Sequence, residues 1–151
     1  MKFLVDSMLG RLAKWLRILG YDTLYFSSLD DNDLVRMARA EGRMVLTRDR
    51  EMVRRRGIDS LLIESDNFKE QVRQVLHDLN LKQDSSFSRC PVCNTSLQNI
   101  AKEAVREKVP PYVFKTQKRF SLCPQCDKIY WRGTHWQRMK ERLKRLEEER
   151  L

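Results

Sequence analysis

Four cysteines, grouped as two Cys-x-x-Cys pairs, constrain the fold of this chain more than any other feature of its sequence. The pairs are Cys90 with Cys93 and Cys123 with Cys126, and no cysteine is left over. Each pair forms a tight turn that aims two sulfurs at one point, and two such turns complete a tetrahedral tetrathiolate zinc site. The sequence therefore predicts a structural Zn²⁺ held by all four thiolates. His135 is a spare ligand, but four sulfurs already close the coordination shell.

The turn residues and the spacing of the pairs predict a zinc ribbon. Asn94 and Asp127 each follow the second cysteine of a pair, where the turn favours a positive φ that Asn and Asp tolerate. The 29 residues between Cys93 and Cys123 suit a ribbon of short strands rather than a compact finger.

Composition narrows the class of protein. With 41% hydrophobic and 34% charged residues, the chain is neither disordered nor embedded in a membrane. Asp6 interrupts the N-terminal apolar run too early for a signal peptide. We therefore expect a cytoplasmic protein with no membrane partner, in which the cysteine pairs are metal ligands rather than disulfides.

The positive charge lies mainly in the second half. Residues 1–88 carry 15 Lys and Arg against 14 Asp and Glu, whereas residues 89–151 carry 15 against 7. The excess of positive charge on the second half favours binding of polyanions, and of nucleic acid above all. The alternative is a solubilising surface without a specific partner.

The first half alternates between strand and helix patterns. Short apolar runs predict strands over 2–5, 22–26, 44–47 and 58–63. Helical periodicity predicts helices over 8–19, 31–41 and 66–79. This order predicts an α/β fold with a mainly parallel sheet flanked by helices.

Four segments follow from these patterns: an α/β domain over 1–81, a linker over 82–88, a zinc ribbon over 89–135 and a charged C-terminal helix over 136–151. In the last segment Met139, Leu143 and Leu146 form a narrow apolar seam. This seam fits either the chain's own first domain or another copy, so the oligomeric state stays open.

Acidic residues follow two of the predicted buried strands. Asp6 comes directly after one strand and Asp49 two residues after another. Because the carboxyl ends of parallel strands share one edge of a sheet, we expect these carboxylates to lie near each other. Like charges resist a close approach unless a cation sits between them, and Mg²⁺ or Mn²⁺ prefers oxygen ligands.

Other charged residues could belong to this site. Among the acids that open the second helix, Asp31 has the best position for a metal ligand or a helix cap, and Asp30 and Asp33 compete with it. Glu51 is either a further carboxylate ligand or a solvated loop acid. Basic residues near the same edge are expected to bind phosphates: Arg48, and the helix face of Arg11, Lys14 and Arg17, whose alternative is an ordinary solvated surface.

These segments resemble the Mut-seven carboxy-terminal RNase family. The stretches that carry the resemblance include Phe3-Leu4-Val5-Asp6, Leu46-Thr47-Arg48-Asp49 and Arg89-Cys90-Pro91-Val92-Cys93-Asn94. The resemblance covers nearly the whole chain apart from the terminal helix. It implies a PIN-like domain with a C-terminal zinc ribbon, and metal-dependent RNA cleavage by acids at the positions of Asp6, Asp31 and Asp49.

The expected function is thus a Mg²⁺- or Mn²⁺-dependent ribonuclease whose zinc ribbon aids RNA binding. The implied reaction is hydrolysis of a phosphodiester by a metal-bound water. A non-catalytic adaptor that binds RNA or the ribosome is the main alternative, and a toxin-type nuclease is a third.

Overall fold

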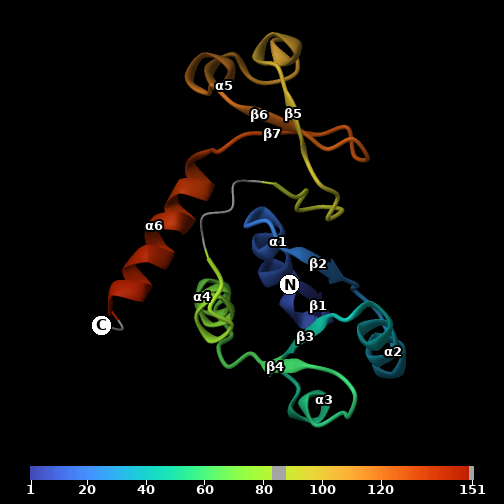
Figure 1. Cartoon of the computed structure of the whole chain (residues 1–151). Helices are drawn as coiled ribbons and strands as arrows, with labels where there is room; N and C mark the ends of the chain where they lie inside the picture. Colours follow the sequence, from blue (N-terminus) through green and yellow to red (C-terminus); the bar gives the residue numbers. More distant parts are fainter. Residues whose placement is uncertain (83–87, 150–151) are drawn as a thin grey trace.

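The computed structural model describes residues 1–82 and 88–149, and side chains up to residue 145 (Figure 1). Its first part is a sheet of four parallel strands in the order β2-β1-β3-β4. The strands are β1 (Lys2–Val5), β2 (Asp22–Tyr25), β3 (Met44–Thr47) and β4 (Ser60–Leu62). The chain moves from β1 to β2 on one side and then crosses to β3 on the other. The topological switch point therefore lies between β1 and β3, where ligands bind in open α/β sheets.

Helices cover both faces of this sheet. They are α1 (Gly10–Ile18), which continues from a short 3₁₀ turn, η1 (Ser7–Leu9), then α2 (Asp31–Glu41), α3 (Arg50–Val53) and α4 (Phe68–Asp78). Phe3 and Val5 pack with α1 and α4 on one face, whereas Leu4 packs with α2 on the other. Burial on both faces explains why the strands read as continuous apolar runs. The predicted α/β fold with a parallel sheet is confirmed.

The second part contains a small antiparallel sheet of β5 (Gln98–Ile100), β6 (Phe120–Leu122) and β7 (Ile129–Tyr130). A 3₁₀ turn, η2 (Lys102–Val105), and a short helix, α5 (Pro111–Thr116), interrupt the connection between β5 and β6. These two helical turns were not predicted. They bury Val105 and Val109 against Phe120, which gives the small sheet an apolar core of its own.

The long helix α6 (Thr134–Glu149) returns from the small sheet to the first domain, where it lies beside α4 (Figure 1). Met139 and Leu143 are buried in the same core cluster as Val72 and Val75 of α4. The predicted seam thus packs on the chain's own first domain at these two positions. The side chain of Leu146 lies outside the described residues, as does nearly all of the predicted linker. Among the helices of the described ranges, none has both the length and the apolar character to cross a membrane.

Candidate acidic site and metal centre

Thr47 connects the two acids at the switch point. Asp6 follows β1, and its backbone N–H donates to the carbonyl of Leu46 on β3 (3.0 Å). The Thr47 hydroxyl donates to Asp6 Oδ2 (2.8 Å) and accepts from the backbone N–H of Asp49 (3.0 Å). Thr47 is fully buried, so this bridge is fixed by the core. The structure therefore brings Asp6 and Asp49 to the same edge of the sheet, on the two sides of the switch point.

Asp49 also begins a helix that was not predicted. Its Oδ1 accepts from the backbone N–H of Glu51 (2.9 Å), which caps the N-terminus of α3. Glu51, the possible further acid, is highly exposed and pairs with Arg54 (3.2 Å). One carboxylate oxygen of Asp49 thus fixes the loop, and the other makes no hydrogen bond with the described residues.

The acids of α2 differ from the expectation in one respect. Asp30 occupies the N-cap position and Asp31 is the first helical residue, but no side chain within residues 1–82 caps this helix by a hydrogen bond. The expected side-chain cap is therefore wrong. Asp33 pairs with Arg36 (3.1 Å). Asp31 makes no such contact with the described residues, and it lies where the chain enters α2 from the carboxyl end of β2.

The three predicted ligands do not form a tight cluster. Among the described residues, the single group of three or more Cys, His, Asp or Glu whose ligand atoms all lie within 4.8 Å is the cysteine quartet. Asp6, Asp31 and Asp49 thus come from neighbouring parts of one edge without meeting at one point. Carboxylate oxygens suit Mg²⁺ or Mn²⁺, which keep several water ligands and can bridge such gaps through them.

The predicted phosphate-binding residues have different surroundings. Arg11 and Lys14 are exposed on α1, and the Arg11 guanidinium lies over the ring of Phe68 (4.8 Å to the centroid). Arg48 is also exposed and donates to the carbonyl of Glu64 (3.4 Å). Arg17 is buried instead, so the expectation that it belongs to a solvated or phosphate-binding face is wrong.

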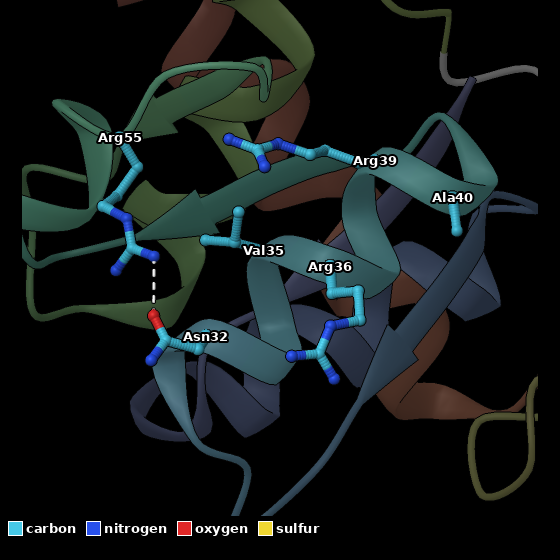
Figure 2. A pocket seen from close by; sticks show the side chains of 6 residues that line it. All are labelled: Asn32, Val35, Arg36, Arg39, Ala40 and Arg55. Atoms are coloured by element: carbon cyan, nitrogen blue, oxygen red, sulfur yellow. Dashed lines mark hydrogen bonds between the residues drawn. The ribbon is translucent and has the colours of Figure 1, made fainter.

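Sequence reasoning also missed an arginine-lined pocket on the outer side of α2. The pocket has a volume of about 570 Å³ and is lined by Arg36 and Arg39 of α2 and by Arg55. Figure 2 shows these side chains. Arg55 donates to the side-chain oxygen of Asn32 (2.8 Å), next to Asp31. The run Arg54-Arg55-Arg56 was the available signal in the sequence. The pocket adds positive charge beside the N-terminus of α2.

The four cysteines form a site for a tetrahedral metal ion. Their sulfurs all lie within 4.8 Å of one another, with 3.5 Å between those of Cys93 and Cys123 and 4.0 Å between those of Cys90 and Cys126. A Zn–S bond of about 2.3 Å in a tetrahedron requires sulfurs about 3.8 Å apart. The described quartet therefore has the donor type and the spacing for zinc.

The two cysteine turns have the same backbone geometry. The N–H of Asn94 donates to the carbonyl of Cys90 (2.8 Å), and the N–H of Asp127 donates to that of Cys123 (2.9 Å). Asn94 has φ 71° and Asp127 has φ 57°, which confirms the predicted left-handed turns. These hydrogen bonds close each turn and direct its two sulfurs toward the same point.

The cysteine thiols influence one another's protonation. Burial raises the pKa of Cys93, but hydrogen bonds with Thr95 and with the other thiols outweigh it and lower the pKa to about 6. The hydrogen bond with Cys93, followed by burial, raises the pKa of Cys126 to about 12. Loss of one proton from the cysteine quartet is thus favoured, whereas loss of further protons is opposed. A divalent cation at the quartet would favour loss of the remaining protons, because it binds thiolates.

The sequence model of the Mut7-C RNAse domain matches residues 1–143. The chain belongs to the Mut7-C RNAse domain family. This membership confirms the resemblance and points to an RNA-related role for the protein. No curated protein and no solved structure matches the chain.

In this Mut7-C chain, the first cysteine turn docks directly on the α/β domain. Arg17 donates from Nε to the carbonyl of Thr23 (2.8 Å) and from Nη1 to the carbonyls of Pro91 (2.9 Å) and Val92 (3.2 Å). Asn94 accepts from the N–H of Thr23 (3.0 Å) and donates to Asp22 (2.7 Å). The metal centre is thereby attached to α1 and to β2.

We expect Arg17→Ala to destabilise this Mut7-C chain by about 1.5–3 kcal/mol, because it removes charged hydrogen bonds and leaves the buried carbonyl of Thr23 without this donor. Lys14→Ala on the same helix is the matched control and should change stability by less than about 0.5 kcal/mol. Urea unfolding of the zinc-loaded protein measures both values. Equal effects of the two substitutions would contradict the docking role of Arg17.

The docking contact also predicts a pH dependence. Burial alone would raise the pKa of Asp22, but hydrogen bonds from Arg43 and Asn94 lower it below its usual value. A carboxyl whose folded pKa is depressed stabilises the fold above its unfolded pKa of about 3.9, and this contribution is lost as the pH falls through the folded value. We expect the stability advantage of the native chain over Asp22→Asn to be full at neutral pH and to shrink below about pH 4. The measurement is the urea unfolding midpoint of both proteins from neutral pH to below about pH 4. A difference between the two midpoints that stays constant with pH would refute the predicted role of Asp22.

Proposed function

We propose that this protein is a ribonuclease that depends on Mg²⁺ or Mn²⁺ and hydrolyses phosphodiester bonds at the edge between β1 and β3. The observation that carries the proposal is the Thr47 hydroxyl, which links the carboxylate of Asp6 to the backbone of Asp49 across the switch point. A buried threonine that holds two acids in place is the kind of support that metal-binding carboxylates require. Family membership adds the expectation that RNA is the substrate.

In this proposal Asp6, Asp31 and Asp49 hold the divalent ion through oxygen ligands. An ion held there would supply a water of lowered pKa as the nucleophile and would stabilise charge on the leaving oxygen. Thr47 orients Asp6, and the cap on α3 orients Asp49. Asp33 and Glu51 are engaged by Arg36 and Arg54, so we assign them no ligand role.

Basic side chains in both parts of the chain bind the RNA backbone. The exposed Arg11, Lys14 and Arg48 and the arginine-lined pocket beside α2 (Figure 2) supply this positive charge in the first domain. We assign residues 1–81 to the nuclease domain, and residues 89–135 with the helix that follows to RNA binding. Because a tetrathiolate centre needs reduced cysteines, we place the protein in the cytoplasm.

The test is RNA cleavage by the zinc-loaded protein after dialysis against metal-free buffer. Added Mg²⁺ or Mn²⁺ should restore cleavage, whereas Ca²⁺, which takes more ligands in a looser geometry, should support it poorly. A rate that is the same with and without divalent ions would refute the proposal. A preparation without zinc serves as the control for the structural site.

One observation favours a second function, that of a non-catalytic RNA-binding adaptor. The three acids do not form a close group among the described residues, although a metal site is expected to gather its ligands. An adaptor would bind RNA with a strong salt dependence and show no turnover with any divalent ion. The same cleavage assay, run together with binding across a salt series, distinguishes the two functions.

A further inference from the structure

A cleft of about 740 Å³ lies between the two parts of the chain. Its walls come from α1, from the first cysteine turn, from β7 and from the start of α6. The hydrogen bonds of Arg17 and Asn94 hold the cysteine turn against α1 and β2, so the two walls are fixed relative to each other. A volume of this size accommodates a small ligand or a short part of a larger one.

The cleft concentrates aromatic rings. Trp15, Trp131 and Trp136 are the only tryptophans in the sequence, and all three line it. Each of these residues is half-buried, and the cationic groups of Arg132 and Lys140 lie over the ring of Trp136 (5.1 and 4.7 Å to the centroid). Trp131 packs edge-on against Phe120 (6.3 Å between centroids), which anchors the indole in the core of the small sheet. Anchored rings with an open part are suitable for stacking with planar groups.

The charges around the cleft have one sign. Arg11 and Lys14 line it from α1, and Lys128 lines it from the ribbon. Within the described part of the chain, none of these three side chains forms an ion pair with a carboxylate, and no acidic residue lines the cleft. Exposed cations without acidic partners, beside indole rings, are complementary to a ligand that carries phosphates and planar bases.

The cleft also approaches the acidic edge. Arg11 follows Asp6 by five residues and lies over Phe68, the first residue of α4 after the carboxyl end of β4. A polymer in the cleft would therefore continue toward Asp6. Stacking on side chains requires bases that are not already paired, so the arrangement suits a single strand rather than a duplex.

We propose that this cleft binds unpaired RNA, with bases stacked on its tryptophans and phosphates held by Arg11, Lys14 and Lys128. The inference rests on the proposed function for the choice of RNA as the ligand. It makes the zinc ribbon one wall of the substrate channel, so that a bound strand contacts both parts of the chain at once.

Tryptophan fluorescence tests the proposal directly, because all three indoles report on the cleft. The probe is a short unstructured oligoribonucleotide added to the zinc-loaded full chain carrying Asp6→Asn, which avoids cleavage. The single strand should quench the fluorescence in a saturable way, and a duplex of the same sequence should not. Absence of quenching, or equal quenching by the duplex, would overturn the proposal.

Charge-reversal variants distinguish RNA binding in the cleft from general electrostatic attraction between RNA and a basic protein. The double variant Lys14→Glu with Lys128→Glu should weaken binding about tenfold and reduce the slope of log affinity against log salt by about 1.4, as expected for two lost phosphate contacts. Lys2→Glu with Lys82→Glu makes the same change at exposed positions outside both the cleft and the ribbon, and should retain most of the affinity. Equal losses in the two double variants would refute the site.

The binding tests of the cleft do not depend on whether the protein cleaves RNA, so the two proposals can fail separately. Cleavage by the native protein without fluorescence quenching would remove the cleft proposal and leave the ribonuclease in place. Quenching by single strands without cleavage under any divalent ion would support the cleft as an RNA-binding site and would contradict the ribonuclease. As a second measurement, a 5-iodouridine oligoribonucleotide should photocrosslink to Trp15, Trp131 or Trp136. Crosslinks confined to Tyr112, which is 76% exposed on α5 outside the cleft, would overturn the proposal.

Discussion

The substitution Asp6→Asn is expected to reduce metal-dependent RNA cleavage by more than about 100-fold. Substitution of a residue that only hydrogen-bonds a metal ligand can already cost about 10–100-fold, and loss of a ligand's charge should cost more. The substitution removes the negative charge but keeps the size of the side chain. The Thr47 hydroxyl can still donate to the amide oxygen of Asn, so the contact that fixes this edge survives. The lost charge should therefore affect catalysis and not folding.

Asp49→Asn should have a similar effect for the same reason. Asparagine caps helices as well as aspartate does, so α3 should still form. The measurement is the initial cleavage rate against Mn²⁺ concentration, together with the affinity for uncleaved RNA, which should stay close to that of the native protein. Unchanged cleavage in both variants would contradict the acidic site.

Two further variants make this test specific. Asp59→Asn is the control, because Asp59 is exposed at the opposite edge of the sheet, just before β4. The Asp59→Asn protein should cleave RNA at the native rate. Thr47→Val removes the bridging hydroxyl and should weaken the apparent affinity for Mn²⁺ by about 10–100-fold. A Thr47→Val effect on stability alone, with an unchanged metal dependence, would show that Thr47 has a purely structural role.

Loss of zinc is expected to have the largest effect on the fold. Structural zinc sites contribute about 10–16 kcal/mol of apparent binding energy in small peptides, and a zinc ion at the cysteine quartet would hold together a sheet of three short strands. Cys126→Ser, or removal of zinc with a strong chelator, should unfold residues 89–135 and expose the tryptophans of the cleft. Zinc content and tryptophan fluorescence measure the two consequences.

His135→Ala is the matched control for zinc binding. His135 is exposed and lies outside the quartet of ligand atoms within 4.8 Å, so this variant should retain one zinc ion per chain. Retention of the ribbon's structure in the zinc-free protein would contradict the prediction.

The sequence predicted the parts of the fold that local patterns determine. The strands were recognisable because burial on both faces leaves no polar positions in runs such as Phe3 to Val5. The cysteine turns followed from spacing and from Asn94 and Asp127. The positions of Asp6 and Asp49 at one edge followed from the rule that parallel strands share their carboxyl ends.

The remaining features depend on contacts between distant residues. Arg17 has the spacing of a solvated helix face, and only the docking of Pro91 and Val92 makes it a buried residue. Helix α3 spans Arg50–Val53, which is too short for a periodic signal. Its cap is Asp49, whose position after a strand predicts a metal ligand and gives no sign of a helix cap. Whether Asp6, Asp31 and Asp49 meet within 4.8 Å depends on loops whose course no local sequence pattern records, and the three do not form such a group.

The return of α6 to the first domain has a consequence for protein synthesis. Met139 and Leu143 of α6 complete a core that otherwise comes from the first domain, so this cluster joins segments that lie far apart in the sequence. Domains usually fold in order as they leave the ribosome. Here the strands of the first domain must wait for α6 before their core is closed, and a nascent chain stalled after α4 would leave that apolar surface open to chaperones.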